Sequence, residues 1–85
     1  GEAKITGTYA GWQENEVLLG CASNLENARY EFKIYDLDKQ KWFWGSGRTG
    51  AGVTWKPNPG NYWLHYELYS MDNRLLDTKT YCFAV

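Results

Sequence analysis

His65, Glu67 and Glu31 are the side chains whose chemistry could support acid-base catalysis. His65 is the only histidine, and it stands two positions before Glu67 in GNYWLHYELYS, residues 60 to 70. A glycosidase needs two carboxyl groups about 5 to 10 Å apart across a sugar-sized cleft. Glu31 and Glu67 would provide the pair if they face each other on adjacent strands, but an open sheet neither excludes water nor distorts a substrate. The sequence therefore predicts no catalysis, with His65 a surface or cross-strand residue.

Metal and phosphate sites need more ligand residues at closer spacing than this sequence contains. One histidine and two separated cysteines lack zinc-ligand spacing. Asp36 with Asp38, and Asp72 with Asn73, invite a calcium interpretation. Each pair, however, stands where a turn favours such a residue. The glycines between 45 and 52 are not followed by the Lys-Ser/Thr of a phosphate loop, so we interpret residues 46 to 52 as a flexible connection. We expect no metal and no cofactor.

Aromatic side chains make up 18% of the chain, about twice the share of an ordinary domain. Alternate positions in the strand predicted within residues 60 to 70 separate two faces. One face carries Tyr62, Leu64, Tyr66 and Leu68, and the other carries Trp63, His65, Glu67 and Tyr69. The first face suits a core, and the second needs another explanation.

The second face has the chemistry of a sugar-binding platform. If residues 29 to 36 pair with this strand, Tyr35 joins the face, and Trp42 and Trp44 join it from the next strand while Phe43 points away. Flat rings stack on pyranoses, and nearby polar side chains would bond hydroxyls. Cross-strand packing, a neighbouring domain and a protein partner are alternatives. The candidate glycan-binding residues are Tyr35, Trp42, Trp44, Trp63, His65 and Tyr69.

Period-two alternation between turn signals predicts strands throughout and no helix. Residues 29 to 36, RYEFKIYD, alternate without a break, and 36 to 39, DLDK, turn the chain into a hairpin with 40 to 45. About seven short strands predict an antiparallel two-sheet sandwich of immunoglobulin or fibronectin type III kind, with a small open barrel as the alternative. The other strands are expected at 3 to 9, 16 to 23, 53 to 57, 60 to 70 and 75 to 85.

Trp55 and Tyr62 are expected to serve the sandwich rather than a ligand. A buried Trp fills such a core, and a Tyr near the start of a late strand bonds back to the preceding corner. Cys21 shares parity with the inward residues of 16 to 23, whereas Cys82 faces the opposite way. Opposite facing disfavours a disulfide bond between them.

Length and charge narrow the function classes. Eighty-five residues allow one domain with a modest core. Nine basic and ten acidic residues give a net charge of -1 with no basic stripe, so nucleic acid is not an expected partner. No apolar run approaches the roughly 18 to 20 residues of a membrane span. The chain starts at Gly1 without Met, and we interpret residues 1 to 85 as a single module of a larger protein.

The run YEFKIYDLDKQKW, followed by TWKPNPGNYWLHYELYS, resembles the triple-tyrosine type of Ig-like repeat. Such repeats stand beside catalytic domains in secreted clostridial and related gut-bacterial cell-wall lysozymes and amidases. The resemblance covers roughly residues 16 to 85. Cys21 and Cys82 depart from the usual pattern. The matching residues are Tyr30, Phe32, Tyr35, Leu37 and Asp38, then Thr54, Trp55 and Pro57, then Gly60, Asn61 and Tyr62.

The resemblance implies a non-catalytic accessory module of an exported bacterial protein, extracellular or in the cell wall, with a peptidoglycan hydrolase as the expected parent. It identifies no ligand-binding residues. Peptidoglycan or another glycan, a neighbouring catalytic domain and sister repeats are the implied partners. The alternative is a structural spacer that packs between domains and has no ligand of its own.

Overall fold

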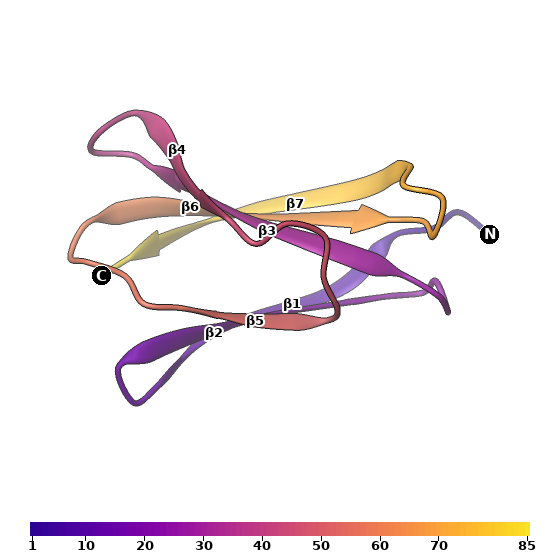
Figure 1. Ribbon diagram of the computed structural model, residues 1–85, viewed down its shortest axis with the longest axis horizontal. Coiled ribbons are helices and arrows are strands. Elements are labelled where there is room, and N and C mark those ends of the chain that lie inside the picture. The colour runs from indigo at the N-terminus through magenta and orange to yellow at the C-terminus, as the bar shows by residue number, and fades with distance from the viewer.

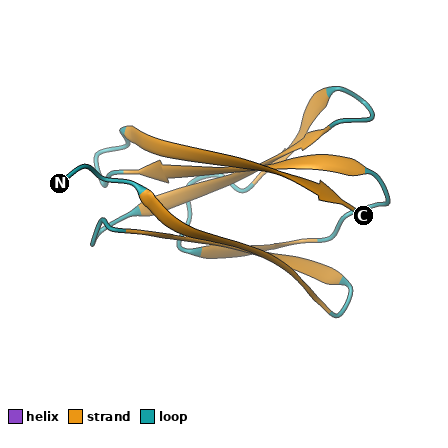
Figure 2. Ribbon diagram, turned by 180° about the vertical axis from the view of Figure 1, so that it is seen from behind, coloured by secondary structure: helices purple, strands orange, loops and turns teal.

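Seven β-strands and no helix make up the computed structural model, which describes residues 1 to 85 (Figure 1). Two antiparallel sheets of order β1-β2-β5 and β4-β3-β6-β7 face each other, as Figure 2 shows from behind. The fold is therefore the predicted Ig-like, fibronectin type III-like sandwich. No helix is available that could cross a membrane. The strands are β1 (Ile5–Gln13), β2 (Glu16–Ser23), β3 (Arg29–Asp36), β4 (Lys41–Gly45), β5 (Gly52–Trp55), β6 (Asn61–Tyr69) and β7 (Leu75–Ala84).

Alternate residues of the central strands build the core between the sheets. Every second residue of β2, β3 and β6 is buried, and Val17, Ile34 and Leu68 are completely so. Phe32 and Tyr66 meet edge to face with ring centroids 5.6 Å apart, a preferred arrangement of aromatic pairs. The predicted inward face of β6, which carries Tyr62, Leu64, Tyr66 and Leu68, is therefore confirmed.

Tyr62 and Trp55 have the structural roles that the sequence predicts. The Tyr62 hydroxyl donates a 2.7 Å hydrogen bond to the Asn58 carbonyl, which ties the start of β6 to the corner before it. Trp55 is buried and packs edge to face on Tyr62, with centroids 4.9 Å apart. These two rings close one end of the core.

The first strand is longer than predicted. The sequence predicts a strand over residues 3 to 9, but β1 continues to Gln13 because the small residues Ala10 and Gly11 also pair with β2. The chain reverses only at Glu14 and Asn15, where Glu14 takes a φ of 57°. A two-residue hairpin turn requires such a positive φ, so the hairpin, rather than the small residues, sets the end of the strand.

The segment 46–52 is not the flexible connection that its glycines predict. Thr49 and Tyr30 exchange two backbone hydrogen bonds of 2.8 and 2.9 Å, and Ser46 N donates to the Phe32 carbonyl. Cys21 N then donates to the Ala51 carbonyl at the start of the crossing to the other sheet. The segment is thus held along β3 before it becomes β5.

The two cysteines face opposite ways, as their parity predicts. Cys21 is buried, and burial raises the pKa of its thiol to about 11. Cys82 is exposed and pairs across the sheet with Trp63 on the outside. Both thiols are free.

Replacing Tyr62 by Phe tests the corner. The variant keeps the ring but leaves the Asn58 carbonyl without its donor, so urea unfolding should show a loss of about 1 kcal/mol in the free energy of unfolding. Tyr81→Phe is the matched control, because Tyr81 is 47% exposed. Equal stability of the two variants would contradict a structural role for the Tyr62 hydroxyl.

Candidate functional site

The site lies on the outer face of the four-stranded sheet, the face turned away from β1, β2 and β5. The register between β3 and β6 places Tyr35 opposite Trp63, Lys33 opposite His65 and Glu31 opposite Glu67. Residues directly opposite each other on one face are in contact. The pairing on which the sequence interpretation of this face depends is therefore present, and it brings three cross-strand pairs of side chains together.

Three aromatic residues form a row across this face, which we call the aromatic row: Trp42 of β4, Tyr35 of β3 and Trp63 of β6. Tyr35 stacks on Trp63 with ring centroids 4.9 Å apart and meets Trp42 edge to face at 5.2 Å. Trp42 and Trp63 remain 55% and 39% exposed. The row is therefore ordered by its own contacts and still open to solvent.

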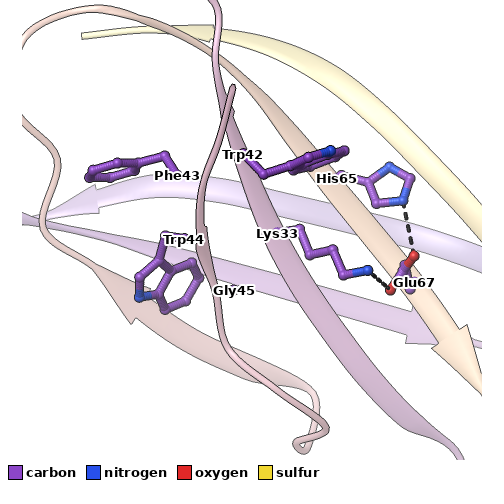
Figure 3. A pocket seen from close by; sticks show the side chains of 7 residues that line it. All are labelled: Lys33, Trp42, Phe43, Trp44, Gly45, His65 and Glu67. Carbon is purple, nitrogen blue, oxygen red and sulfur yellow. Dashed lines mark hydrogen bonds and ion pairs between the residues drawn. The ribbon is translucent and has the colours of Figure 1, made fainter. Parts of the chain in front are cut away.

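Trp44 does not join the aromatic row, which corrects the sequence prediction. The pairing of β4 with β3 shifts between Ile34 and Tyr35, so that Trp42 lies opposite Tyr35 and Trp44 opposite Ile34. Phe43 is the extra residue of this β-bulge, which reverses the parity that simple alternation assumes. Trp44 consequently packs against the core. Figure 3 shows its ring on the other side of β4 from Trp42.

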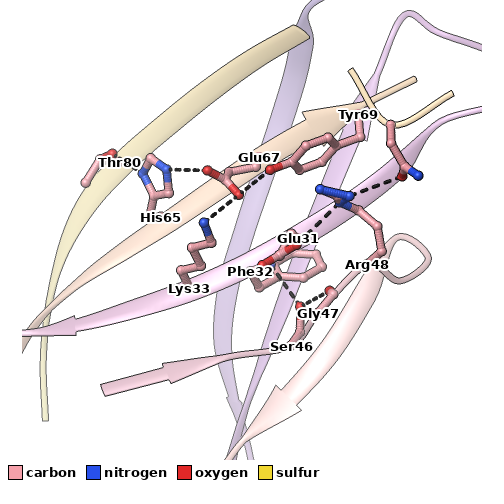
Figure 4. A network of polar contacts seen from close by, with 11 residues as sticks. Glu31, Phe32, Lys33, Ser46, Gly47, Arg48, His65, Glu67, Tyr69 and Thr80 are labelled. Atoms are coloured by element: carbon pink, nitrogen blue, oxygen red, sulfur yellow. Dashed lines mark hydrogen bonds and ion pairs between the residues drawn. The ribbon is translucent and has the colours of Figure 1, made fainter. Parts of the chain in front are cut away.

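Tyr69 also departs from the prediction, because it is covered. Its position is on the outer face, yet only 8% of it is exposed. The Arg48 guanidinium lies 3.2 Å from the centre of its ring, a cation–π contact, and reaches Asn73 Oδ1 at 3.2 Å (Figure 4). Arg48 also pairs with Glu31 at 3.4 Å, without hydrogen-bond alignment. Tyr69 therefore offers no ring face to a ligand.

His65 and Glu67 belong to one polar network (Figure 4). Glu67 accepts from Lys33 Nζ at 3.1 Å and from the Tyr69 hydroxyl at 3.0 Å, and its other oxygen lies 3.2 Å from His65 Nε2. His65 Nδ1 lies 2.8 Å from Thr80 Oγ1. A neutral His65 with its proton on Nε2 fits both contacts. The Trp42 ring meets His65 at a steep angle, with centroids 5.6 Å apart, so His65 links the network to the aromatic row.

Glu67 stays ionised although it is buried. Burial alone would raise the pKa of its carboxyl, but hydrogen bonds from Lys33, Tyr69 and His65 together outweigh burial and hold the pKa below its ordinary value. The same contact raises the pKa of Lys33. The pair is therefore a fixed cation and anion at neutral pH.

Glu31 and Glu67, which the sequence analysis considered as a carboxyl pair, do lie opposite each other on β3 and β6. Glu31 is occupied by Arg48, and Glu67 by three donors. General acid catalysis in a glycosidase calls for a carboxyl whose pKa is raised, whereas that of Glu67 is lowered. Each of the two carboxylates is thus paired with a cation, as in a structural ion-pair network.

The turn aspartates make turn contacts. Asp36 Oδ1 accepts from the Lys39 amide at 3.0 Å, and Asp38 accepts from the backbone and side chain of Asn61. Asp72 accepts from the Ser70 hydroxyl. No group of three or more metal-ligating side chains comes together in residues 1 to 85.

A groove of about 530 Å³ opens beside Trp42 (Figure 3). It forms because Gly45, which lies opposite Lys33, has no side chain to fill the outer face there. The Lys33–Glu67 pair and His65 line its polar side. Its lining residues are Lys33, Trp42, Phe43, Trp44, Gly45, His65 and Glu67.

Arg48, Thr80 and Gly45 contribute to the site without having been predicted. Arg48 stands in a Gly-rich segment with no periodicity, so no pattern places it over Tyr69. Thr80 shares outward parity on β7 with Cys82, a signal that could have been read. Gly45 lies opposite Lys33 only because the bulge shifts the pairing of β4 with β3, and simple alternation does not predict that shift.

No family model matches the chain, and no curated protein matches it. Among solved structures, the chain is similar to Lactobacillus rhamnosus β-glucuronidase, with a TM-score of 0.57 and 14% sequence identity. The match covers 98% of this chain and 16% of that chain. This likeness supports the sandwich fold alone.

Glu67→Gln tests the network through its pH dependence. A folded-state pKa below the ordinary value of 4.5 means that the contribution of Glu67 to stability is present above pH 4.5 and lost as the pH falls through the folded-state pKa. The variant should be less stable by about 1 to 3 kcal/mol at pH 7 and should lose less stability than the parent on acidification.

The matched control is Glu26→Gln, the same change at an exposed residue. Urea unfolding measured from pH 7 to pH 2 should give parallel curves for this control and the parent. A Glu67→Gln curve that also runs parallel to the parent would contradict an ionised, hydrogen-bonded Glu67.

Proposed function

We propose that this domain is a non-catalytic accessory module of an exported bacterial cell-wall protein, a peptidoglycan hydrolase, and that it binds glycan through the aromatic row. The observation that carries the proposal is the row itself, in which Trp42 and Trp63 are exposed and held in place. The resemblance of residues 16 to 85 to triple-tyrosine repeats supports the cell-wall setting and the extracellular location.

The geometry of the aromatic row suits an extended sugar chain. It runs across the strands from β4 to β6 and continues to Cys82 on β7. Three strand spacings of about 4.8 Å make this span about 14 Å long. Indole and phenol rings bury apolar C–H surface of a sugar at little conformational cost, and polar neighbours supply orientation. Of the six predicted residues, Tyr35, Trp42, Trp63 and His65 therefore remain the binding candidates.

The non-catalytic part of the proposal rests on the polar network. Both acidic residues of the outer face are paired with cations, and the groove lies beside the exposed Trp42 ring. A carboxyl with a raised pKa in a water-excluding cleft would be expected of an acid catalyst. The domain has features of a recognition surface instead.

A structural spacer is the second candidate. Tyr35 and Trp63 stack on each other, so part of the aromatic surface is already covered without a ligand. The two termini lie at opposite ends of the longest axis, which measures 39 Å, an arrangement that suits a module in a row of domains (Figure 1). A spacer would bury Trp63 against a neighbour and bind no sugar.

Trp42→Ala tests the proposed function. Removal of an exposed stacking ring should lower retention of the domain on purified cell walls by about tenfold, because one stacking contact contributes about 1 to 1.5 kcal/mol. Trp12→Ala is the matched control, since Trp12 is 51% exposed but belongs to the other sheet. We expect it to bind like the parent.

Pull-down on insoluble peptidoglycan, with titration of soluble fragments followed by tryptophan fluorescence, provides the measurement. Equal losses of cell-wall retention in Trp42→Ala and Trp12→Ala would show that binding does not depend on the aromatic row. No binding of the parent domain at millimolar ligand would exclude the glycan proposal and favour the spacer.

A further inference from the structure

The groove beside the aromatic row has a shape set by the backbone. The β-bulge at Phe43 turns Trp42 outward and Trp44 inward, and Gly45 leaves the space beside Lys33 empty. The hollow therefore adjoins the Trp42 ring on which a sugar would stack. A substituent that projects from such a sugar toward β6 would enter it (Figure 3).

The polar side of the groove carries no net formal charge when His65 is neutral. Lys33 and Glu67 neutralise each other at 3.1 Å, and the Glu67 side chain is only 8% exposed. Lys33 is 34% exposed and has N–H groups to spare, since one contact with Glu67 uses one of its three donors. The Glu67 oxygen facing His65 keeps acceptor capacity.

Charged substituents fit this lining poorly. A ligand carboxylate bonded to Lys33 would come close to the ionised Glu67, and like charges in a partly buried site repel. A ligand ammonium bonded to Glu67 would likewise come close to the Lys33 ammonium and be repelled by it. A neutral group with one acceptor, one donor and an apolar end matches the unused Lys33 donors, the remaining acceptor capacity of Glu67 and the ring of Trp42.

We propose that the groove recognises the acetamido substituent of an N-acetylated amino sugar whose ring stacks on Trp42. The carbonyl oxygen accepts from Lys33, the amide N–H donates to Glu67, and the methyl group packs on aromatic carbon. This assignment rests on the proposed glycan binding and adds the sugar class that the groove selects.

Two matched ligands test it: the β-1,4 tetramer of N-acetylglucosamine and the β-1,4 tetramer of glucose, which carries a hydroxyl in place of each acetamido group. Dissociation constants from tryptophan fluorescence should favour the acetylated tetramer by about tenfold, the effect of one or two net hydrogen bonds. Equal affinities would overturn the acetamido assignment while leaving glycan binding intact. Binding of neither tetramer, with no binding to cell walls, would overturn both.

Gly45→Val fills the groove without removing the aromatic row. A Cβ at Gly45 would lie 3.8 Å from Lys33 Cγ, an ordinary contact, and valine is favoured in strands. The variant should bind the acetylated tetramer no more tightly than it binds the glucose tetramer. Gly50→Val is the control, because a Cβ there meets nothing within 4 Å, and it should retain the preference. A retained preference in Gly45→Val would also overturn the assignment.

Discussion

A carboxylate removed from water must be surrounded by donors, and Glu67 imposes that requirement on the outer face. It is met by Lys33 of β3 and by Tyr69 and His65 of its own strand, and His65 in turn contacts Thr80 of β7. One buried charge thus fixes side chains on three strands. The aromatic row lies beside this network and touches it through His65 and Trp42.

The bulge in β4 provides the second constraint, and it is local. By adding Phe43 to the pairing with β3, it sends Trp42 to the outer face and Trp44 to the core. Glycine at position 45 then leaves the outer face hollow beside Lys33. The stacking ring and one side of the adjacent groove therefore come from the five residues of the edge strand β4, and Lys33, His65 and Glu67 complete the groove.

Much of the fold was predictable because alternation is a property of the strand itself. The inward residues of β6 and the Tyr62 corner follow from parity and turn position. The pairing of β3 with β6 entered the sequence interpretation only as a condition, and the structure meets that condition. The site was predictable in part. Tyr35, Trp63 and His65 lie where parity places them.

The failures share a physical cause, which is that parity holds only while strands pair without interruption. Trp44 was misplaced because a bulge adds one residue. Tyr69 has the predicted parity, but Arg48 reaches it from a segment that hydrogen bonds hold along β3, and no local sequence pattern reports such a contact.

The most direct test of the account is an NMR titration of the indole N–H resonances with solubilised peptidoglycan fragments. Each of the five tryptophans gives one such resonance. Binding at the aromatic row predicts saturable shifts for Trp42 and Trp63, while Trp12 on the other sheet and Trp55 in the core stay unchanged. Shifts centred on Trp12, or no shift of any indole at millimolar concentration, would contradict the account.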